Sequence, residues 1–376
     1  MKNLSIMIKP ASGGCNLRCK YCFYADITEH REVASYGKMS EATLETLVKK
    51  VLEESEESCT FVFQGGEPTL AGLDFFRSLT ALQQRYRKKG QAVHNAIQTN
   101  GTLLTGEWVE FLAEHHFLTG ISVDGNKKVH DDLRPDSQGK GTFQRVFQTV
   151  EMLKKAGVDY NILTVVTRQS ARHIQQIYGQ YRKYGWNYMQ FIPCLDEYDA
   201  ERGSSFYSLK PESYARFLKD LFDVWYQDIR SGHYVYIRYF ENLVGILMGV
   251  EPESCGLLGG CHAQLVVEAD GSAYPCDFYV TDSYRMGNIR ESGLAELLSC
   301  ETAKRFEQES YPPHPDCISC RYGYLCRGGC RRDRDYRGTI GRNYYCESLL
   351  EFFVYAEPRL REAAAIYRSG VLGRKV

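Results

Sequence analysis

Three closely spaced cysteines, Cys15, Cys19 and Cys22, form a C-x3-C-x2-C run just after a short apolar segment. A [4Fe-4S] cluster normally takes one protein thiolate on each of its four irons. Three thiolates on one loop therefore leave one iron free to bind another molecule. A structural zinc site would need four protein ligands, and no fourth ligand lies near the run in the sequence. The run indicates an iron–sulfur cluster with one open iron.

An aromatic residue, Tyr21, directly precedes the third cysteine of the run. The spacing of the three cysteines and the aromatic residue before the third resemble the signature of the radical S-adenosylmethionine (SAM) enzymes. The resemblance implies that the free iron binds the amino and carboxylate groups of SAM. It also implies that one electron cleaves SAM to methionine and a 5′-deoxyadenosyl radical. A zinc loop or a chance cluster of cysteines is the alternative.

A second group of eight cysteines begins at residue 255. Its members are Cys255, Cys261, Cys276, Cys317, Cys320, Cys326, Cys330 and Cys346. Eight thiolates can complete two [4Fe-4S] clusters, and they can also bind zinc in two four-cysteine sites. Clusters with a thiolate on every iron have no open site, so we expect them to carry electrons. The other cysteines, Cys59, Cys194 and Cys300, are interpreted as small buried apolar side chains.

The spacing of this second group resembles the SPASM domain of peptide-modifying radical SAM enzymes. Gly271-x4-Cys276 is followed by C-x2-C-x5-C-x3-C and by a last cysteine. By that resemblance, one auxiliary cluster is held by Cys255, Cys261, Cys276 and Cys330, and the other by Cys317, Cys320, Cys326 and Cys346. The spacing alone does not assign these two sets. The resemblance implies three [4Fe-4S] clusters in total, with SAM as the further cofactor.

Short apolar segments alternate with helical patterns as far as residue 232, which is typical of repeated βα units. The predicted strands span residues 4–9, 60–64, 94–99, 119–123, 160–166 and 188–192. The predicted helices span residues 41–54, 75–88, 107–114, 143–156, 171–184 and 211–230. Six such units predict an α/β fold, an open (β/α)6 partial TIM barrel of the radical SAM type.

Composition changes beyond a predicted bridging helix at residues 237–248, where cysteine and glycine become dense. We therefore expect a radical SAM partial barrel over residues 1–232, a bridging helix within 233–250, and a SPASM auxiliary-cluster domain over 251–376. The last part should contain a β-hairpin at residues 265–276, with Asp-Gly in its turn, and an amphipathic helix near 348–368.

Glycine and polar residues follow most of the predicted strands directly. The segments after strands one, two, three, four and six are residues 15–22, 64–68, 98–101, 122–125 and 194–195. Active sites of parallel-strand barrels gather at the carboxyl ends of the strands. Each segment alone could be a turn, but together they predict one active rim.

Charge and hydropathy exclude several classes of partner. The net charge is −1 and the isoelectric point is about 6.8, which gives no overall attraction to nucleic acid or to an anionic membrane. The sequence has no apolar run of the roughly 18 residues that cross a membrane, and we expect no signal peptide. Because the cytosol keeps thiols reduced, the 14 cysteines indicate metal ligation in a cytoplasmic protein.

Asp277 is the residue that we expect to act as a general base. It directly follows Cys276, and bonding to a cluster ligand would fix its backbone. A preorganised carboxylate could then take a proton while an electron leaves the substrate. An exposed carboxylate without a role at the end of the hairpin is the alternative.

Several further stretches resemble the anaerobic sulfatase-maturating enzymes, and the resemblance covers the whole chain. They are residues 8–12, 63–72, 98–102, 208–211, 274–279 and 326–332. The resemblance implies oxidation of a cysteine or serine in a short sulfatase motif to Cα-formylglycine without oxygen. It also implies that Asp277 accepts the proton and that the auxiliary clusters accept an electron. The SAM contacts that it implies are Tyr21, Gly66, Ser122, Arg134 and Leu195.

The implied partners are an unfolded sulfatase segment as substrate and an electron donor such as ferredoxin or flavodoxin. We expect a monomer that binds neither nucleic acid nor membrane. One alternative is a radical SAM/SPASM maturase that forms a thioether or carbon–carbon crosslink in a ribosomal peptide. Such maturases commonly carry an N-terminal leader-binding domain, for which the 14 residues before Cys15 leave too little chain. The second alternative, a non-catalytic zinc or electron-transfer protein, leaves the early cysteines without a role.

Overall fold

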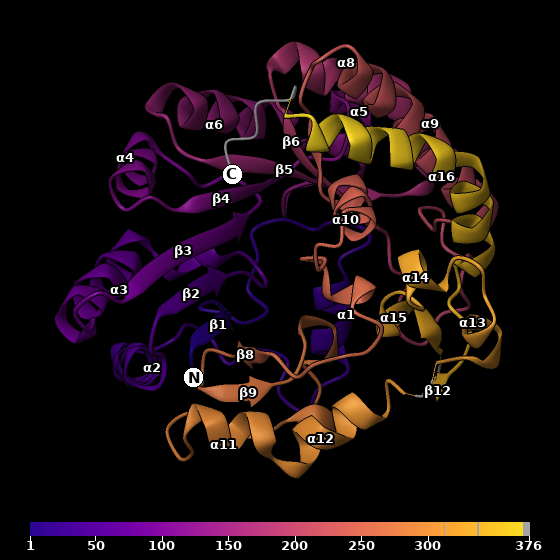
Figure 1. Cartoon of the computed structure of the whole chain (residues 1–376). Coiled ribbons are helices and arrows are strands. Elements are labelled where there is room, and N and C mark those ends of the chain that lie inside the picture. The colour runs from indigo at the N-terminus through magenta and orange to yellow at the C-terminus, as the bar shows by residue number, and fades with distance from the viewer. Residues whose placement is uncertain (312, 337, 371–376) are drawn as a thin grey trace. The chain divides into compact units, whose positions relative to one another are not determined.

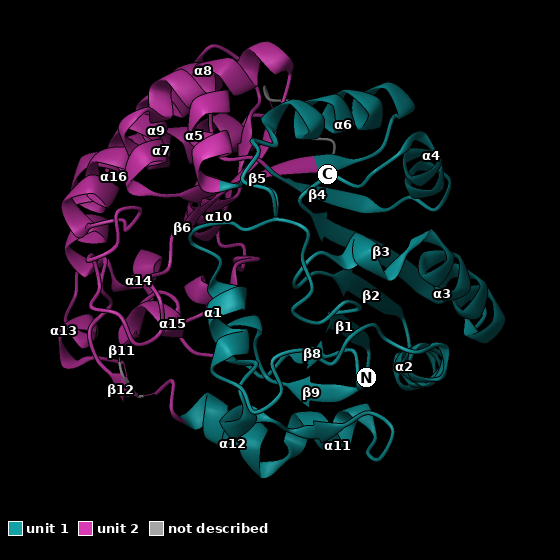
Figure 2. Cartoon of the chain, turned by 180° about the vertical axis from the view of Figure 1, so that it is seen from behind, with its two compact units in different colours: residues 1–122, 134–160, 262–308 teal, residues 123–133, 161–261, 309–376 magenta. Residues whose placement is uncertain are grey.

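The computed structural model describes residues 1–311, 313–336 and 338–370 (Figure 1). The chain divides into two compact units, each assembled from separate stretches of sequence. Unit 1 comprises residues 1–122, 134–160 and 262–308, and unit 2 comprises residues 123–133, 161–261 and 309–376. Figure 2 shows the two units in different colours. Both units therefore combine early and late parts of the chain.

Unit 1 is built on a mixed β-sheet. Its strands are β1 (Asn3–Ile8), β2 (Ser58–Phe63), β3 (Ala92–Thr99), β4 (Leu118–Ser122), β8 (Leu265–Val267), β9 (Ser272–Tyr274) and β10 (Gly287–Asn288). They are ordered β10-β9-β8-β1-β2-β3-β4, and all neighbours from β8 to β4 pair in parallel. The register sets Ile8 beside both Phe63 and Val267. The carboxyl ends of β1, β2 and β8 therefore lie at one edge of the sheet.

Helices line one face of this sheet. The helices of unit 1 are α1 (Phe23–Glu29), α2 (Glu41–Glu54), α3 (Leu73–Tyr86), α4 (Gly106–Glu114), α6 (Phe143–Ala156), α11 (Leu294–Ser299) and α12 (Glu301–Gln308), with 3-10 turns η1 (Pro68–Ala71), η3 (Asp277–Tyr279) and η4 (Asp282–Tyr284). Helices α2, α3, α4 and α6 lie on the outer face (Figure 2). In α2, Leu44, Leu47, Val48 and Val51 are buried at helical spacing, and the Ser40 hydroxyl caps the helix.

The β8–β9 hairpin belongs to the unit 1 sheet because β8 pairs with β1. Its turn contains Asp270 and Gly271, and Gly271 has a φ of +89°. A Cβ at this position would also lie 2.8 Å from Asn288 Oδ1. The sequence predicted the hairpin and its turn, but it did not indicate that the hairpin would extend the N-terminal sheet.

Unit 2 contains a parallel sheet in the order β5-β6-β7 and most of the C-terminal helices. The strands are β5 (Tyr160–Val166), β6 (Tyr188–Pro193) and β7 (Tyr236–Ile237), with a separate pair β11 (Asp335–Tyr336) and β12 (Thr339–Ile340). The helices are α5 (Lys127–Leu133), α7 (Arg168–Arg172), α8 (Ile174–Tyr184), α9 (Pro211–Arg230), α10 (Arg238–Leu247), α13 (Pro315–Ile318), α14 (Gly323–Cys326), α15 (Arg331–Arg334) and α16 (Cys346–Arg368), with the 3-10 turn η2 (Cys255–Leu257).

Aromatic side chains fill the core of unit 2. The Phe222 ring of α9 lies 5.6 Å from Trp225, 5.4 Å from Phe240 of α10 and 5.7 Å from Phe352 of α16, measured between ring centroids. Rings at such separations bury large apolar areas and add favourable edge-to-face contacts. The C-terminal helix is therefore fixed against α9 and α10.

Most predicted elements agree with the observed bounds. Helices α2, α6 and α9 and strand β5 have the predicted limits. The predicted helix at residues 171–184 is wrong in detail, because the chain forms two helices, α7 and α8, that meet at His173 with a φ of −118°. Helices α1 and α5 had no counterpart in the prediction.

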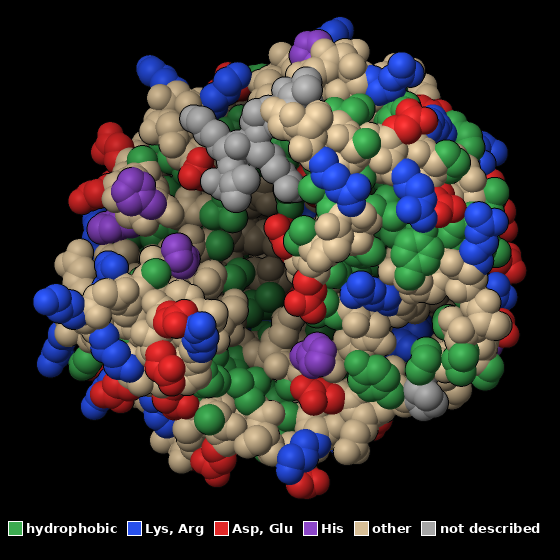
Figure 3. Space-filling view, viewed as in Figure 1, with side chains coloured by type: hydrophobic (Ala, Val, Ile, Leu, Met, Phe, Trp, Pro, Cys, Tyr) green, Lys and Arg blue, Asp and Glu red, His purple; other side chains and the backbone are tan. Residues whose placement is uncertain are grey.

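The surface agrees with the near-zero net charge. Figure 3 shows Lys and Arg side chains interspersed with Asp and Glu over the visible face. None of the described helices has the length and apolar character that crossing a membrane requires.

Candidate active site

The cysteines of the first run lie on the unit 1 loop between β1 and α1, and each is half-buried and forms no disulfide within the described part of the chain. Cys15 Sγ accepts a hydrogen bond from its own loop's backbone and a longer one, at 3.9 Å, from the Asn100 amide. Cys19 Sγ accepts one from the Arg134 guanidinium, also at 3.9 Å. Such donors favour the thiolate form that a metal ligand must adopt. Burial raises the pKa of the Cys15 thiol, so iron would have to displace its proton.

Asn100, which follows β3, ties the cysteine loop to the rim. Its side-chain N–H donates to Asn16 Oδ1 at 2.9 Å, and Asn16 donates in turn to the Thr102 hydroxyl at 2.8 Å. Asn100 Oδ1 accepts the backbone N–H of Thr102 at 2.9 Å. The predicted rim segment 98–101 therefore holds the cysteine loop directly.

Gly65 and Gly66 allow the segment after β2 to approach the cysteine loop. Their φ angles are +91° and +52°. A Cβ built on Gly66 would lie 2.2 Å from the backbone oxygen of Gly14 and 2.7 Å from that of Ser12. The next residue, Glu67, donates its backbone N–H to the same Gly14 oxygen at 2.7 Å. Only glycine at position 66 leaves room for this backbone-to-backbone contact.

The carboxylate of Glu67 is a structural link between the rim segments. Its Oε1 accepts from the Thr69 N–H and hydroxyl and from the Thr99 hydroxyl, at 3.1, 2.6 and 2.6 Å. Its Oε2 accepts the Asn100 N–H at 2.8 Å. Burial raises the pKa of this carboxyl, and the hydrogen bonds oppose that rise. With four donors bound, Glu67 is suited to hold the rim rather than to act on a substrate.

Gly66→Ala is expected to weaken SAM binding by about tenfold or more. The new methyl group would force the rim segment away from Gly14 and distort the loop that carries the cysteines. Gly37→Ala is the matched control, because Gly37 has a φ of +71° but no atom within 4 Å of an added Cβ. Equilibrium binding of SAM to the two reconstituted variants measures the difference. Equal affinities would mean that the close contact at Gly66 has no part in the SAM site.

Four of the five expected SAM contacts lie in unit 1. Tyr21 and Arg134 are buried together, with the guanidinium carbon 5.4 Å from the ring centroid. Ser122 is the buried last residue of β4, and Gly66 makes the close backbone contact with Gly14 that is described above. Residues 134–136 reach the cysteine loop because Pro135 accepts the Arg18 N–H at 2.8 Å. The fifth, Leu195, lies in unit 2.

Asp277 begins the turn η3 and is buried, unlike an ordinary carboxylate at the end of a hairpin. The Lys9 ammonium donates to its Oδ1, and the Gln64 side-chain amide donates to its Oδ2. Lys9 follows β1 and is completely buried, and Gln64 follows β2. Two distant parts of the sequence therefore fix this carboxylate, whose remaining lone pairs can accept a proton.

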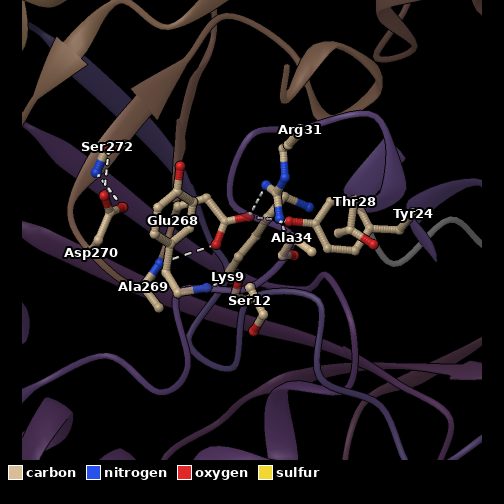
Figure 4. Close-up of polar contacts among 12 residues, drawn as sticks. Lys9, Ser12, Tyr24, Thr28, Arg31, Ala34, Glu268, Ala269, Asp270 and Ser272 are labelled. Carbon is tan, nitrogen blue, oxygen red and sulfur yellow. Dashed lines mark hydrogen bonds and ion pairs between the residues drawn. The ribbon is translucent and has the colours of Figure 1, made fainter. Parts of the chain in front are cut away.

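The ring of Tyr24, in α1, lies against this ion pair. Lys9 Nζ is 3.8 Å from the ring centroid, a short cation–π distance. The Tyr24 hydroxyl donates to Glu268, which also accepts from Arg31 at 2.7 Å (Figure 4). Burial and the Glu268 carboxylate raise the pKa of Tyr24 well above its usual value, so Tyr24 remains a hydrogen-bond donor.

All the later predicted cluster ligands except Cys276 lie in unit 2. Burial, together with the smaller effects of the Cys346, Cys317 and Cys320 thiols, raises the pKa of the Cys326 thiol to about 11. The four cysteines of one expected auxiliary set therefore influence one another electrostatically, although among the described residues no three metal-ligating side chains are arranged as a metal site. In the other set, the pKa of Cys261 is raised by burial and, in smaller part, by Cys255. Cys276 lies in unit 1, just after β9.

Two cavities in unit 2 are lined by expected site residues. Leu195 lines a small cavity of about 20 Å³ with Asp196, Arg202 and Tyr344. A larger cavity of about 190 Å³ has mostly apolar and aromatic walls and includes Cys326 and Cys330.

The residues present suit the cofactors that the sequence indicates. Three thiols on one loop, two of them with hydrogen-bond donors on sulfur, can serve three irons of a cluster. The close backbone contact at Gly66 sets the rim segment directly against that loop.

Comparison with known proteins identifies the family. The model of the radical SAM superfamily matches residues 10–180, and that of the SPASM iron–sulfur cluster-binding domain matches residues 260–321. The chain is 47% identical, over 97% of its length and 99% of the relative's, to the cysteine-type anaerobic sulfatase-maturating enzyme of Clostridium perfringens (strain 13 / Type A). The chain belongs to the anaerobic sulfatase-maturating enzymes.

Other anaerobic sulfatase-maturating enzymes match over similar lengths. The serine-type enzyme of Bacteroides thetaiotaomicron is 31% identical over 95% of this chain and 90% of that protein. The solved structure of native anSMEcpe with bound AdoMet and Cp18Cys peptide has a TM-score of 0.93 and 47% identity, covering 96% of this chain and 99% of that one. The predicted family, the partial (β/α)6 barrel of the radical SAM type and the C-terminal SPASM domain are confirmed.

As an anaerobic sulfatase-maturating enzyme, the chain is a radical SAM oxidoreductase whose cofactors are SAM and [4Fe-4S] clusters, three in number as in its family. Its predicted function, oxygen-independent formation of formylglycine in a sulfatase peptide, is the one that the relatives support. A non-catalytic zinc protein is excluded, and a crosslinking maturase does not fit this identity across the chain.

Several residues that hold the site had no predicted role. Lys9, Gln64 and Asn100 lay inside stretches that carried the family resemblance, but none received a role. Lys9 had a signal of its own, because a lysine directly after the apolar strand β1 is out of place unless it has a buried partner. Arg31 and Glu268 had no comparable signal, since their pairing depends on the β1–β8 contact.

Proposed function

We propose that the substrate residue is a cysteine, which the enzyme oxidises to Cα-formylglycine within an unfolded sulfatase segment. The observation that carries this choice is the difference in identity. The cysteine-type relatives are 47% and 45% identical to the chain, whereas the serine-type relatives are 31% identical. The solved relative with a bound Cp18Cys peptide supports a peptide as the substrate class.

When bound, SAM and the clusters supply a 5′-deoxyadenosyl radical that removes a Cβ hydrogen atom and an acceptor for one electron. The chain's own part is the proton. In the proposal, Asp277 takes the proton from the substrate thiol, held for that step by Lys9 and Gln64. Loss of one hydrogen atom, one proton and one electron converts the thiol to a thioaldehyde. Water then yields the aldehyde and releases hydrogen sulfide.

The remaining assignments are part of the same proposal. Cys15, Cys19 and Cys22 would hold the SAM cluster, and the eight later cysteines would hold the auxiliary clusters in the two sets given above. Tyr21, Gly66, Ser122, Arg134 and Leu195 would contact SAM. The proposal also includes the domain limits 1–232, 233–250 and 251–376. The electron donor would be a ferredoxin or flavodoxin. The protein would be a cytoplasmic monomer that binds neither nucleic acid nor membrane.

The choice of substrate predicts a clear preference between two synthetic peptides. A peptide with a Cys-x-Pro-x-Arg motif should form the aldehyde with kcat/KM at least about tenfold above that of its serine counterpart, because the pocket must fit the larger thiol. Mass spectrometry and hydrazine labelling measure the carbonyl, and a peptide with alanine at the target position is the control. Equal rates would contradict the cysteine preference. An internal crosslink without a carbonyl would contradict the reaction itself.

A further inference from the structure

Two buried ion pairs stand side by side in unit 1. Lys9 pairs with Asp277, and the Arg31 guanidinium pairs with Glu268 at 2.7 Å. The side chains of Lys9, Arg31 and Glu268 are fully buried, and that of Asp277 is 11% exposed. The proposed mechanism uses only the first pair. A buried ion pair adds little net stability compared with apolar residues of similar size, so the second pair calls for another explanation.

The sheet register sets the two pairs next to each other. Strands β1 and β8 are parallel, and their last paired residues are Ile8 and Val267. Lys9 and Glu268 are the next residues on each strand, and the Lys9 N–H donates to the Val267 oxygen at 2.8 Å. The cation that holds Asp277 and the carboxylate that holds Arg31 are therefore neighbours at the same edge of the sheet.

Tyr24 joins the two pairs. Its hydroxyl donates to Glu268 Oε1, and the face of its ring lies 3.8 Å from Lys9 Nζ. Glu268 is itself fixed, because Arg31 donates to Oε1 and the Ala269 N–H donates to Oε2 at 3.2 Å. Figure 4 shows Arg31 and Tyr24 converging on Glu268, with Lys9 close by. Arg31 also donates to the Ala34 oxygen at 2.8 Å, which fixes its far side.

The Lys9 ammonium has few other groups to hold it. It is completely buried, and among the described residues its Nζ atom donates to Asp277 and lies over the Tyr24 ring. A lysine side chain has four rotatable bonds and loses much rotamer freedom when it is fixed. The ring therefore limits where the ammonium can lie, and the hydroxyl bond to Glu268 limits where the ring can lie.

We propose that Glu268 and Arg31 are positioning residues for the oxidation. They fix Tyr24, which keeps Lys9 in place and, through Lys9, orients the carboxylate of Asp277 toward the substrate proton. The inference depends on the proposed role of Asp277 as the base. In this proposal Glu268 and Arg31 neither contact the substrate nor transfer a proton.

Glu268→Gln tests this positioning. The amide keeps the size of the side chain and removes the charge that orients both Tyr24 and Arg31. We expect kcat for the aldehyde to fall by about tenfold, with KM for the peptide changed by less than about twofold, as for an interaction that matters after binding. The yield of 5′-deoxyadenosine per aldehyde should rise, because hydrogen abstraction precedes the proton step.

A second readout does not depend on the clusters. Acylation of amines at low reagent excess, followed by peptide mass spectrometry, reports whether Lys9 has become accessible. Lys9 should resist acylation in the parent protein and should be modified several times faster in Glu268→Gln, as expected when local order is lost. Exposed lysines such as Lys2 and Lys49 provide the internal standard, since their rates should not change.

Two further variants make the test decisive. Tyr24→Phe keeps the ring and removes only the hydroxyl, so it should reproduce the uncoupling. The double variant of Tyr24→Phe and Glu268→Gln should be no less active than the poorer of the two single variants. Glu241→Gln is the matched control, because Glu241 is a buried carboxylate in unit 2 that accepts a hydrogen bond from Tyr367. It should lower stability without uncoupling.

The outcomes distinguish failure of the positioning role from failure of the proposed proton transfer to Asp277. Uncoupling and faster Lys9 acylation in Glu268→Gln, with full iron content, support the positioning role. Unchanged coupling and unchanged acylation overturn it, as does a loss of activity equal to that of Glu241→Gln. If Asp277→Asn retains full product formation, Asp277 is not the base, and the proposed proton step fails whatever Glu268 does.

Discussion

The variant in which Cys15, Cys19 and Cys22 are all alanine should lose about four irons per chain and all SAM cleavage. These thiols share one loop, which lies within the residues that match the radical SAM model and which we propose to hold the radical SAM cluster. Eight other cysteines are available for the auxiliary clusters, so about eight irons should remain. Clusters with four thiolates have no open iron, so they cannot replace the missing one.

Iron and sulfide analysis of anaerobically reconstituted protein, together with chromatography of 5′-deoxyadenosine, measures both effects. Cys300→Ala is the control, because Cys300 is also half-buried but belongs to none of the three proposed ligand sets. It should keep the full iron content. Persistent 5′-deoxyadenosine in the triple variant would mean that another set of cysteines binds SAM.

The alternation of apolar and helical segments was sufficient to predict the barrel. Local patterns, such as the buried Cys59, Phe61 and Phe63 of β2 or the helical spacing in α2, carry their own signal. The predicted rim was also informative, because the segments 64–68 and 98–101 lie against the cysteine loop through Glu67 and Asn100. Each of these features depends on residues within one short stretch of sequence.

Contacts between distant segments were not predictable in this way. The pairing of β8 with β1 brings Asp277 to Lys9 and Glu268 to Arg31, across more than two hundred residues of chain. No periodicity within either strand specifies which strand it pairs with. For this reason the sequence indicated Asp277 by its neighbour Cys276 but gave no indication of the groups that hold its side chain.

Asp277→Asn should separate hydrogen abstraction from product formation. Asparagine keeps the shape of the side chain, but it cannot take up a proton at neutral pH. Aldehyde formation should fall by a factor of about 10² or more, as is typical for loss of a positioned general base. Because abstraction comes before the proton step, SAM and peptide should still bind and some 5′-deoxyadenosine should still form.

The structure also shows what else the substitution changes. The oxygen of the new side-chain amide could still accept from Lys9, and the Gln64 amide could turn so that its own oxygen accepts from the new N–H₂ group. Lys9 would nevertheless lose its buried counter-charge, so the melting temperature should fall. Measurements should therefore be made well below that temperature.

Asp270→Asn is the matched control for this experiment. Asp270 lies in the turn of the same β8–β9 hairpin, where it accepts hydrogen bonds from the Ser272 N–H and hydroxyl at 3.0 and 2.7 Å. The side-chain oxygen of asparagine can still accept the Ser272 N–H, and its N–H₂ group can donate to the Ser272 hydroxyl. Product formation should therefore stay close to that of the parent enzyme. If Asp277→Asn behaves like this control, the carboxylate is not the base. If it loses iron, Asp277 supports the Cys276 cluster instead. Retained iron with uncoupled 5′-deoxyadenosine is the result that only a base at position 277 explains.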